Sequence, residues 1–188
     1  MKGTLVVVSA PSGGGKNTVV HELQKKFLNS ARMVTSTTRE PRSGEVNGED
    51  YFFRTYAEFQ EKISNNELIE YNEYAGNFYG IEKEMLGEFL RKYDYVFATI
   101  DVHGKEALDD RGIQHISLFL LPESEEILKN RIKNRSEIDD VEVEKRLFEM
   151  DNELKSSKKY DFLVVNKNGK LDETVDNIVN YLKKQKNS

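Results

Sequence analysis

Short apolar runs along the chain alternate with segments in which apolar residues recur every three or four positions. Four runs are rich in β-branched and aromatic residues and have the length of strands buried on both faces: 4–9, 95–100, 116–121 and 162–165. Helical spacing follows the first run and recurs at later places: 19–28, 127–132, 143–154 and 175–182. Strands alternating with helices predict an α/β fold, a parallel sheet between two layers of helices.

Two segments interrupt this alternation. Residues 34–80 are rich in Tyr, Phe, Thr, Glu and Arg and contain two turn signals, so we predict a small, mostly β insert with one helix near 56–64. Residues 123–155 are strongly charged and predict two helices that meet at a polar turn near 136–140. We therefore predict a single domain, 1–188, whose core consists of residues 1–33, 81–122 and 156–188.

Composition narrows the class of protein. The 188 residues are 37% hydrophobic and 32% charged, as expected for one soluble globular domain. The net charge of −5 argues against general nucleic-acid binding, and no apolar run is long enough for a signal peptide or a membrane span. Cysteine is absent, which excludes disulfides and thiolate chemistry. We therefore expect a cytoplasmic protein, either a monomer or a homo-oligomer, without a nucleic-acid or membrane partner.

Residues 10–17, APSGGGKN, nearly fit the loop pattern that holds nucleotide phosphates. The glycines at 13–15 allow turns that aim successive backbone N–H groups inward, and the following helix adds its positive end. Lys16 can reach the terminal phosphates. A glycine-rich turn without a ligand is the alternative, but strand, loop, lysine and helix all occur in the required order. Ala10 replaces the first glycine of the pattern.

Asn17 is the departure with chemical consequences, because a Ser or Thr hydroxyl is expected there as a Mg²⁺ ligand. Its amide oxygen lies on a longer arm beside an NH₂ group, so it ligates after local adjustment or leaves the position to water. Thr18, at the next helix position, is not a simple replacement. Since metal assistance contributes several kcal/mol to phosphoryl transfer, we expect slower transfer but retained nucleotide binding.

Two arginines in the insert, Arg39 and Arg42, flank the dipeptide Glu40-Pro41. Two guanidinium groups beside a proline-stiffened turn form a fork for a phosphate dianion, and Tyr51 and Tyr79 could add hydroxyl donors. Taken alone, two arginines are more often solvated surface charge. Asp101 is a further candidate for the site. It ends a predicted buried strand, and parallel sheets present groups to ligands at that end of their strands.

Six segments together resemble the guanylate kinase family, the ATP:GMP phosphotransferases of the nucleoside-monophosphate kinase group. They are SAPSGGGKNT, STTREPRSGEVNGEDYFF, LIEYNEYAGNFYG, IDVHG, RIKNR…EKRL and DFLVVN. The second and third are specific to this family, whereas the first is shared with many NTPases. The resemblance spans nearly the whole chain. It implies a P-loop core, an insert that binds the acceptor nucleotide, a helical lid, and transfer of a phosphoryl group from Mg-ATP to GMP or dGMP.

The resemblance also implies roles for single residues. Those matching the ATP site are Ala10, Pro11, Ser12, Gly13, Gly14, Gly15, Lys16, Asn17, Thr18, Arg131 and Asn166. Those matching the GMP site are Thr35, Arg39, Arg42, Glu45, Tyr51, Glu70, Tyr79, Thr99 and Asp101. The catalytic set would be Lys16, Arg39, Arg135 and Arg146, with Arg131, Arg135 and Arg146 on the lid. The candidates for contact with Mg²⁺ are Asn17 and, through water, Asp101.

Glu70 matches the carboxylate that reads the base, and chemistry favours that role. Guanine presents N1–H and the exocyclic N2–H₂ as adjacent donors to one carboxylate, whereas adenine turns an acceptor toward it. Thr99 and Ile81 replace polar residues of the resembled family, an aspartate and a Ser or Thr, and both changes remove contacts from the base pocket. Two alternatives stay open: a non-catalytic guanylate-kinase-like binding module, and a kinase for another phosphate-bearing acceptor. The three histidines are interpreted as structural or surface residues: His21, His103 and His115.

Overall fold

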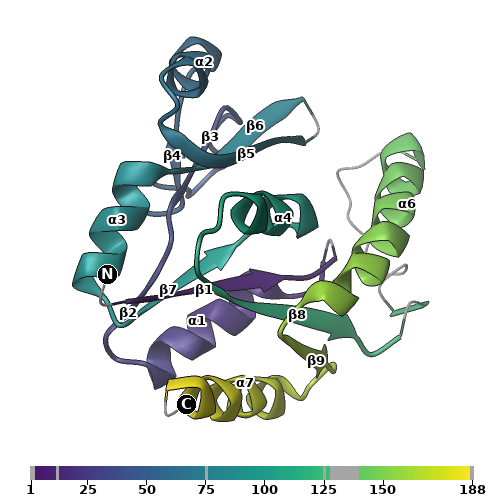
Figure 1. The fold of residues 1–188 in the computed structure, drawn as a ribbon. Helices are drawn as coiled ribbons and strands as arrows, with labels where there is room; N and C mark the ends of the chain where they lie inside the picture. The colour runs from purple at the N-terminus through teal and green to yellow at the C-terminus, as the bar shows by residue number, and fades with distance from the viewer. Residues whose placement is uncertain (1–2, 12, 75, 125, 128–139, 187–188) are drawn as a thin grey trace.

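The core of the molecule is a five-stranded parallel sheet in the order β2-β7-β1-β8-β9 (Figure 1). The structure is a computed structural model, which describes residues 3–186 except 12, 75, 125 and 128–139. The core strands are β1 (Thr4–Ser9), β2 (Ser30–Arg32), β7 (Tyr95–Thr99), β8 (Ile116–Pro122) and β9 (Phe162–Asn166). The four predicted strands and their parallel arrangement are confirmed. The prediction missed β2, whose three residues are too few to form a recognisable pattern.

Helices cover both faces of this sheet (Figure 1). Their bounds are α1 (Lys16–Lys26), α3 (Lys83–Lys92), α4 (Val102–Asp110), α6 (Asp140–Ser156) and α7 (Leu171–Lys186), with a short 3₁₀ turn, η1 (Ser157–Lys159), after α6. Along β1, Val6 and Val8 join a hydrophobic cluster with α1 and α7. Leu5 and Val7 join a second cluster with α3 and α4 on the opposite face. All four side chains are at most 1% exposed, so the prediction of a strand buried on both faces is confirmed here.

The outer strand β9 differs from the prediction that it is buried on both faces. Val164 packs into the cluster on the α7 side, but Leu163 is 41% exposed and Val165 is 43% exposed. The sheet order explains the difference, because β9 is an edge strand with a paired neighbour, β8, on one side only. An apolar run identifies a strand but does not reveal that it lies at an edge.

The insert forms a separate mixed sheet in the order β4-β3-β6-β5. Its elements are β3 (Thr35–Thr37), β4 (Tyr51–Phe53), α2 (Tyr56–Ser64), β5 (Leu68–Tyr74) and β6 (Asn77–Glu82). The predicted helix near 56–64 is confirmed, with its buried Phe59 stacked on Phe78 at 5.4 Å between ring centroids. Ile69 and Ile81 belong to the same cluster as α3 and α4, so the insert packs directly on the core.

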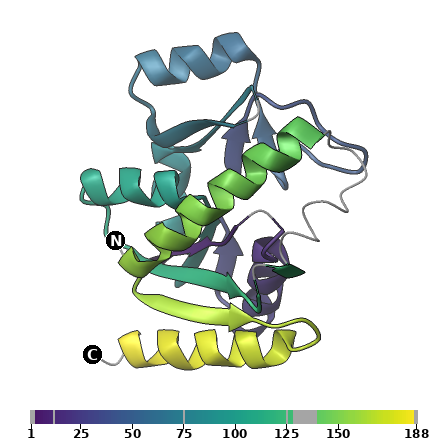
Figure 2. The same ribbon diagram turned by 90° about the vertical axis from the view of Figure 1, so that its right-hand side faces the viewer.

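The helix α6 rises from the core sheet toward the insert, as Figures 1 and 2 both show. It agrees with the second helix predicted in 123–155, whereas the first predicted helix and the turn near 136–140 fall largely outside the described residues. The fold class is therefore confirmed as α/β with a parallel core, a separate mixed sheet and helices, and the boundaries of core, insert and lid stay predictions. Among the described residues, no helix is both long and apolar enough to cross a lipid bilayer.

Two glycines on neighbouring elements provide a matched test of how closely β5 and β6 pack. A Cβ added at Gly80 would lie 2.8 Å from the backbone oxygen of Glu70, a contact that only a backbone shift can relieve, whereas one at Gly87 on α3 would meet nothing nearer than an Arg91 nitrogen at 3.4 Å. We expect Gly80→Ala to lower the free energy of unfolding by about 1–3 kcal/mol. We expect Gly87→Ala to leave it unchanged or to raise it by up to about 1 kcal/mol. Urea unfolding measures both, and equal effects would contradict the close approach.

Candidate functional site

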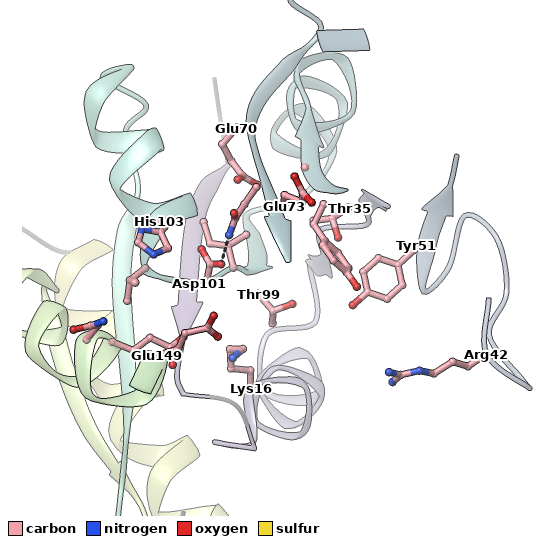
Figure 3. A pocket seen from close by; sticks show the side chains of 17 residues that line it. Lys16, Thr35, Arg42, Tyr51, Glu70, Glu73, Thr99, Asp101, His103 and Glu149 are labelled. Atoms are coloured by element: carbon pink, nitrogen blue, oxygen red, sulfur yellow. Dashed lines mark hydrogen bonds between the residues drawn. The ribbon is translucent and has the colours of Figure 1, made fainter. Parts of the chain in front are cut away.

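A cavity of about 450 Å³ lies between the insert, the start of α1, the carboxyl end of β7 with the start of α4, and α6 (Figure 3). Eight of the residues predicted for the site line it: Lys16, Thr35, Arg42, Tyr51, Glu70, Tyr79, Thr99 and Asp101. Six further polar residues that were not predicted for the site also line it: Asn72, Glu73, His103, Glu149, Asn152 and Glu153. The cavity therefore collects side chains from each of the three regions that the sequence distinguished.

The loop between β1 and α1 needs each of its three glycines for a physical reason. Gly13 and Gly15 have φ angles of 79° and 87°, in the left-handed region that favours glycine. A Cβ at Gly14 would lie 2.6 Å from the Cβ of Ala10 and 2.9 Å from the carbonyl oxygen of Pro11. Within the described residues, no side chain caps α1 and no acidic residue lies in its first turn. The positive end of the helix is therefore turned toward the loop, as an anion site requires.

Two side chains hold the loop in place. Lys16 Nζ donates a hydrogen bond of 2.6 Å to the carbonyl oxygen of Ala10, so its ammonium group lies over the loop. Asn166, at the end of β9, donates from Nδ2 to the carbonyl oxygen of Gly14 at 3.0 Å and accepts from Thr174 Oγ1 at 3.3 Å. Asn166 thus contacts the loop itself, in addition to any role toward a donor nucleotide.

Several predicted residues lie apart from the cavity lining or cannot be described. Asn17 and Thr18 are exposed at the start of α1 and do not line the cavity. Ser12, Arg131 and Arg135 lie outside the described residues. For the remaining predicted lid arginine, Arg146, only the helical backbone within α6 is described.

Arg39 and Glu45 lie beside the cavity and are paired with each other. Arg39 Nη2 donates to both carboxylate oxygens of Glu45, at 2.8 and 2.9 Å, and its guanidinium carbon lies 5.3 Å from the centre of the Tyr51 ring. The backbone N–H of Arg42 also donates to Glu45, at 2.8 Å. These contacts fix the turn at Glu40-Pro41, with Arg42 itself exposed and extending toward the cavity (Figure 3).

The two predicted hydroxyl donors meet at the same end of the cavity as Arg42. The rings of Tyr51 and Tyr79 form an edge-on pair with centroids 6.1 Å apart. Burial, with a smaller contribution from Tyr79, raises the pKa of the Tyr51 phenol above its ordinary value of 10. Tyr51 therefore stays protonated at neutral pH and is able to donate a hydrogen bond to an anion.

Glu70 lies at the opposite, inner end, where its side chain is 4% exposed. It pairs across the strands with Ile81, an apolar residue that is fully buried. Burial raises the pKa of Glu70 to about 8, the negative charge of Asp101 contributes in the same direction, and Arg111 partly opposes it. Such a carboxyl group is protonated at neutral pH until a ligand stabilises its charged form.

The helix α6 brings acidic side chains to the cavity. Glu149, Asn152 and Glu153 are three and four positions apart and thus share a helix face. Burial raises the pKa of Glu153 to about 7, against the lowering effect of Lys16 and with further raising by Asp101 and Glu149. Glu153 therefore lies close enough to Lys16 for their charges to interact.

Sequence reasoning missed Asn72 and this face of α6. The apolar positions of the same helix, Met150 and Leu154, indicated which side packs on the core. The polar residues between them looked like a solvated face, although their i, i+3, i+4 spacing was a usable signal. His103, interpreted as structural or as a surface residue, also lines the cavity while its side chain is 74% exposed.

With this geometry in view, comparison with known proteins decides the family. The family model for guanylate kinase matches residues 2–185. The chain belongs to the guanylate kinase family. It is 38% identical to the guanylate kinase of Wolbachia sp. subsp. Brugia malayi (strain TRS) over 98% of this chain and 94% of that protein. It is 40% identical to the guanylate kinase of Clostridioides difficile (strain 630) over 90% of this chain and 82% of that one.

Solved structures agree with the family. A guanylate kinase from Anaplasma phagocytophilum superposes with a TM-score of 0.77 at 32% identity, covering 97% of this chain and 86% of that one. A shikimate kinase from Bacteroides thetaiotaomicron, at 15% identity and a TM-score of 0.51 over 96% and 98% of the two chains, shares the fold. The predicted recognition is confirmed, and membership of the guanylate kinase family implies a nucleoside-monophosphate kinase.

The raised pKa of Glu70 makes a prediction about stability. Its carboxyl group binds a proton up to about pH 8 in the folded protein but only up to its ordinary pKa of 4.5 in the unfolded chain. The free energy of unfolding therefore falls as pH rises between these two values, and Glu70 contributes no further change above pH 8. We expect Glu70→Gln to remove this contribution. Between about pH 5.5 and pH 8.5, the free energy of unfolding of the variant should therefore fall less than that of the wild type, with a difference of a few kcal/mol in order of magnitude. Urea unfolding at both pH values tests this, and parallel changes in the two proteins would contradict it.

Proposed function

We propose that this protein transfers the γ-phosphoryl group of ATP to GMP or dGMP, giving ADP and the nucleoside diphosphate in purine nucleotide metabolism. The observation that carries the proposal is a single cavity with opposite chemistry at its two ends. Arg42 and the hydroxyl groups of Tyr51 and Tyr79 lie at one end, and the buried carboxyl group of Glu70 lies at the other. A nucleotide has the same division, with anionic phosphates at one end and a hydrogen-bonding base at the other.

The donor site of the proposed reaction is the loop between β1 and α1. Its backbone N–H groups and the uncapped start of α1 would hold the phosphates of ATP, and Lys16 would move from the carbonyl oxygen of Ala10 to the terminal phosphates. Asn166 would keep the loop in shape through its hydrogen bond to Gly14. The loop therefore needs little rearrangement of its backbone to bind a polyphosphate.

The acceptor site is formed by the insert. Arg42, Tyr51 and Tyr79 would hold the phosphate of GMP, joined by Arg39 if its guanidinium group turns from Glu45 toward the dianion. Glu70 would accept hydrogen bonds from N1–H and N2–H₂ of guanine. Adenine would leave that carboxylate facing a lone pair, which is the physical basis for rejecting AMP.

The residues near the loop fit the Mg²⁺ that accompanies ATP. Mg²⁺ in kinases keeps several waters and takes one or two protein ligands besides the phosphates, so a full protein cage is not needed. Asn17 offers a neutral amide oxygen, and Asp101 offers carboxylate lone pairs beyond the two hydrogen bonds it already accepts. The described residues contain no group of three or more acidic or histidine side chains suited to a metal ion. When bound, Mg²⁺ would neutralise charge that develops on the phosphates.

The chain's own contribution to catalysis would be position and positive charge. Two phosphates repel each other, and phosphoryl transfer requires them in line and in contact. Lys16 on the donor side and Arg39 with Arg42 on the acceptor side would offset this repulsion. Arg131, Arg135 and Arg146, from the predicted lid, would complete the cationic surround and exclude water, whose attack would hydrolyse ATP.

A coupled assay for ADP release with a panel of acceptors tests the proposed function. We expect ADP and a stoichiometric amount of the nucleoside diphosphate with GMP or dGMP as acceptor, and an efficiency lower by about 10³-fold or more with AMP. The control variant Lys16→Met, which removes the ammonium group, should abolish transfer while the protein stays folded by circular dichroism. Binding of GMP without ADP release would instead identify a binding module, and equal use of AMP and GMP would reject the role of Glu70.

The variant Asn17→Ser tests the departure in the loop. Because a serine hydroxyl suits Mg²⁺ better than the longer amide, we expect kcat to rise about tenfold or more with little change in the KM for GMP. Titration with a fluorescent ATP analogue gives a second readout, in which Mg²⁺ should strengthen binding more in Asn17→Ser than in the wild type. Affinity without Mg²⁺ should be the same in both proteins. If neither quantity changes, Asn17 is already compatible with the metal or irrelevant to it.

A further inference from the structure

Asn72 joins Glu70 to Asp101 across the inner end of the cavity. It lies on β5 two residues after Glu70, so the two side chains are on the same side of the strand, and both line the cavity. Its Nδ2 donates a hydrogen bond of 2.6 Å to Oδ2 of Asp101, the dashed line in Figure 3. This contact joins the insert to the core, because Asp101 follows β7 and precedes α4.

Asp101 is held from two sides. Its Oδ1 accepts a hydrogen bond of 2.8 Å from the backbone N–H of Gly104, which caps the start of α4, while Oδ2 accepts from Asn72. Both oxygens thus have a hydrogen-bond partner within the protein. A side chain at Gly104 would also be crowded, since a Cβ there would lie 3.2 Å from Oε2 of Glu70. Asp101 is consequently a fixed point beside the base-binding end of the cavity.

This fixed carboxylate determines which way the amide of Asn72 faces. A carboxylate only accepts hydrogen bonds, so the NH₂ group of Asn72 must be the side turned toward Asp101. The amide oxygen, Oδ1, is bonded to the same carbon and therefore points away from Asp101. Asn72 therefore presents a hydrogen-bond acceptor next to the carboxylate of Glu70.

The exocyclic amino group of guanine has two N–H donors, and one carboxylate does not satisfy both. Glu70 has one oxygen for N1–H and one for the nearer N2–H, so the second N2–H needs another acceptor. Each oxygen of Asp101 already accepts one hydrogen bond from the protein, and Thr99 offers only a short hydroxyl. Asn72 Oδ1 is a neutral acceptor that the same strand places beside Glu70.

We infer that Asn72 is a specificity-determining residue of the acceptor site: its Oδ1 accepts a hydrogen bond from the exocyclic amino group of the base, and Asp101 is the positioning residue that fixes the amide. The inference rests on the proposed function and adds to it a second contact to the base. It identifies a purine with an amino group at C2 as the preferred acceptor, and it assigns to Asn72 the distinction between GMP and IMP, which lacks that group.

Steady-state kinetics with GMP and IMP test the inference. In Asn72→Ala, we expect kcat/KM for GMP to fall about tenfold, mainly through KM, while kcat/KM for IMP changes less than about threefold. The ratio of the two efficiencies therefore falls. Asn177→Ala, which removes an exposed asparagine on α7, is the matched control and should leave both efficiencies unchanged.

A second variant tests the positioning role of Asp101. In Asp101→Asn, the new amide can donate as well as accept, so it no longer fixes the orientation of Asn72, and the GMP-to-IMP ratio should fall here too. This variant also gives an answer if Asn72→Ala does not fold, which thermal unfolding reports. Equal losses with GMP and IMP in either folded variant would mean a purely structural role and would overturn the inference. A wild type that does not phosphorylate GMP would instead overturn the proposed function.

Discussion

The behaviour of the cavity depends on the closeness of two carboxylates, Glu70 and Asp101, at its inner end. Like charges in a poorly hydrated place cannot both be kept without compensation. Asp101 has that compensation, because it accepts hydrogen bonds from Asn72 and from the backbone of Gly104 and lies at the positive start of α4. Glu70 is almost fully buried beside Ile81, and its pKa is raised to about 8. In the proposed reaction the missing compensation comes from the ligand, since a base edge that donates two hydrogen bonds favours the charged form of Glu70.

The outer end of the cavity contains side chains of both charges. There Lys16 and Arg42 face the space, and the acidic residues Glu149 and Glu153 come from α6. The ammonium group of Lys16 donates a hydrogen bond to the carbonyl oxygen of Ala10 and is attracted by the charge of Glu153. A phosphate that binds Lys16 competes with both. In the proposed reaction, donor binding would therefore be connected to the position of α6, a helix that lies almost entirely within the predicted lid, 123–155.

The sequence was most informative where one residue type serves one physical requirement. Glycines at 13–15, followed by Lys16, predicted an anion-binding loop because few other residues adopt those backbone angles. Three of the four buried strands were predicted correctly for a similar reason, since burial on both faces leaves a continuous apolar run. The fourth, β9, has such a run but lies at the edge of the sheet, and edge position depends on strand order, which a local pattern does not contain.

The contacts missed from the sequence are those between distant elements. Asn72 is an ordinary polar residue of a strand until the fold places Asp101, 29 positions later in the chain, at 2.6 Å from its amide. Glu153 is one of many acidic residues in a charged helix until α6 crosses the cavity near Lys16. Family resemblance did not supply these residues either, because it transfers roles only to positions that match a known motif.

In the loop, the groups proposed to bind the nucleotide differ from the side chain proposed to affect phosphoryl transfer. The groups proposed to bind phosphate are backbone N–H groups, and their geometry depends on Gly13, Gly14 and Gly15, none of which tolerates a Cβ without rearrangement. Asn17 lies just beyond them, on the exposed side of the first turn of α1. Because the Asn17 side chain is exposed, we expect a change at this position to leave the shape of the loop intact. In the proposed reaction, the consequence of asparagine there would fall on the chemical step, where the identity of one oxygen donor matters, while the main chain and Lys16 would hold the nucleotide.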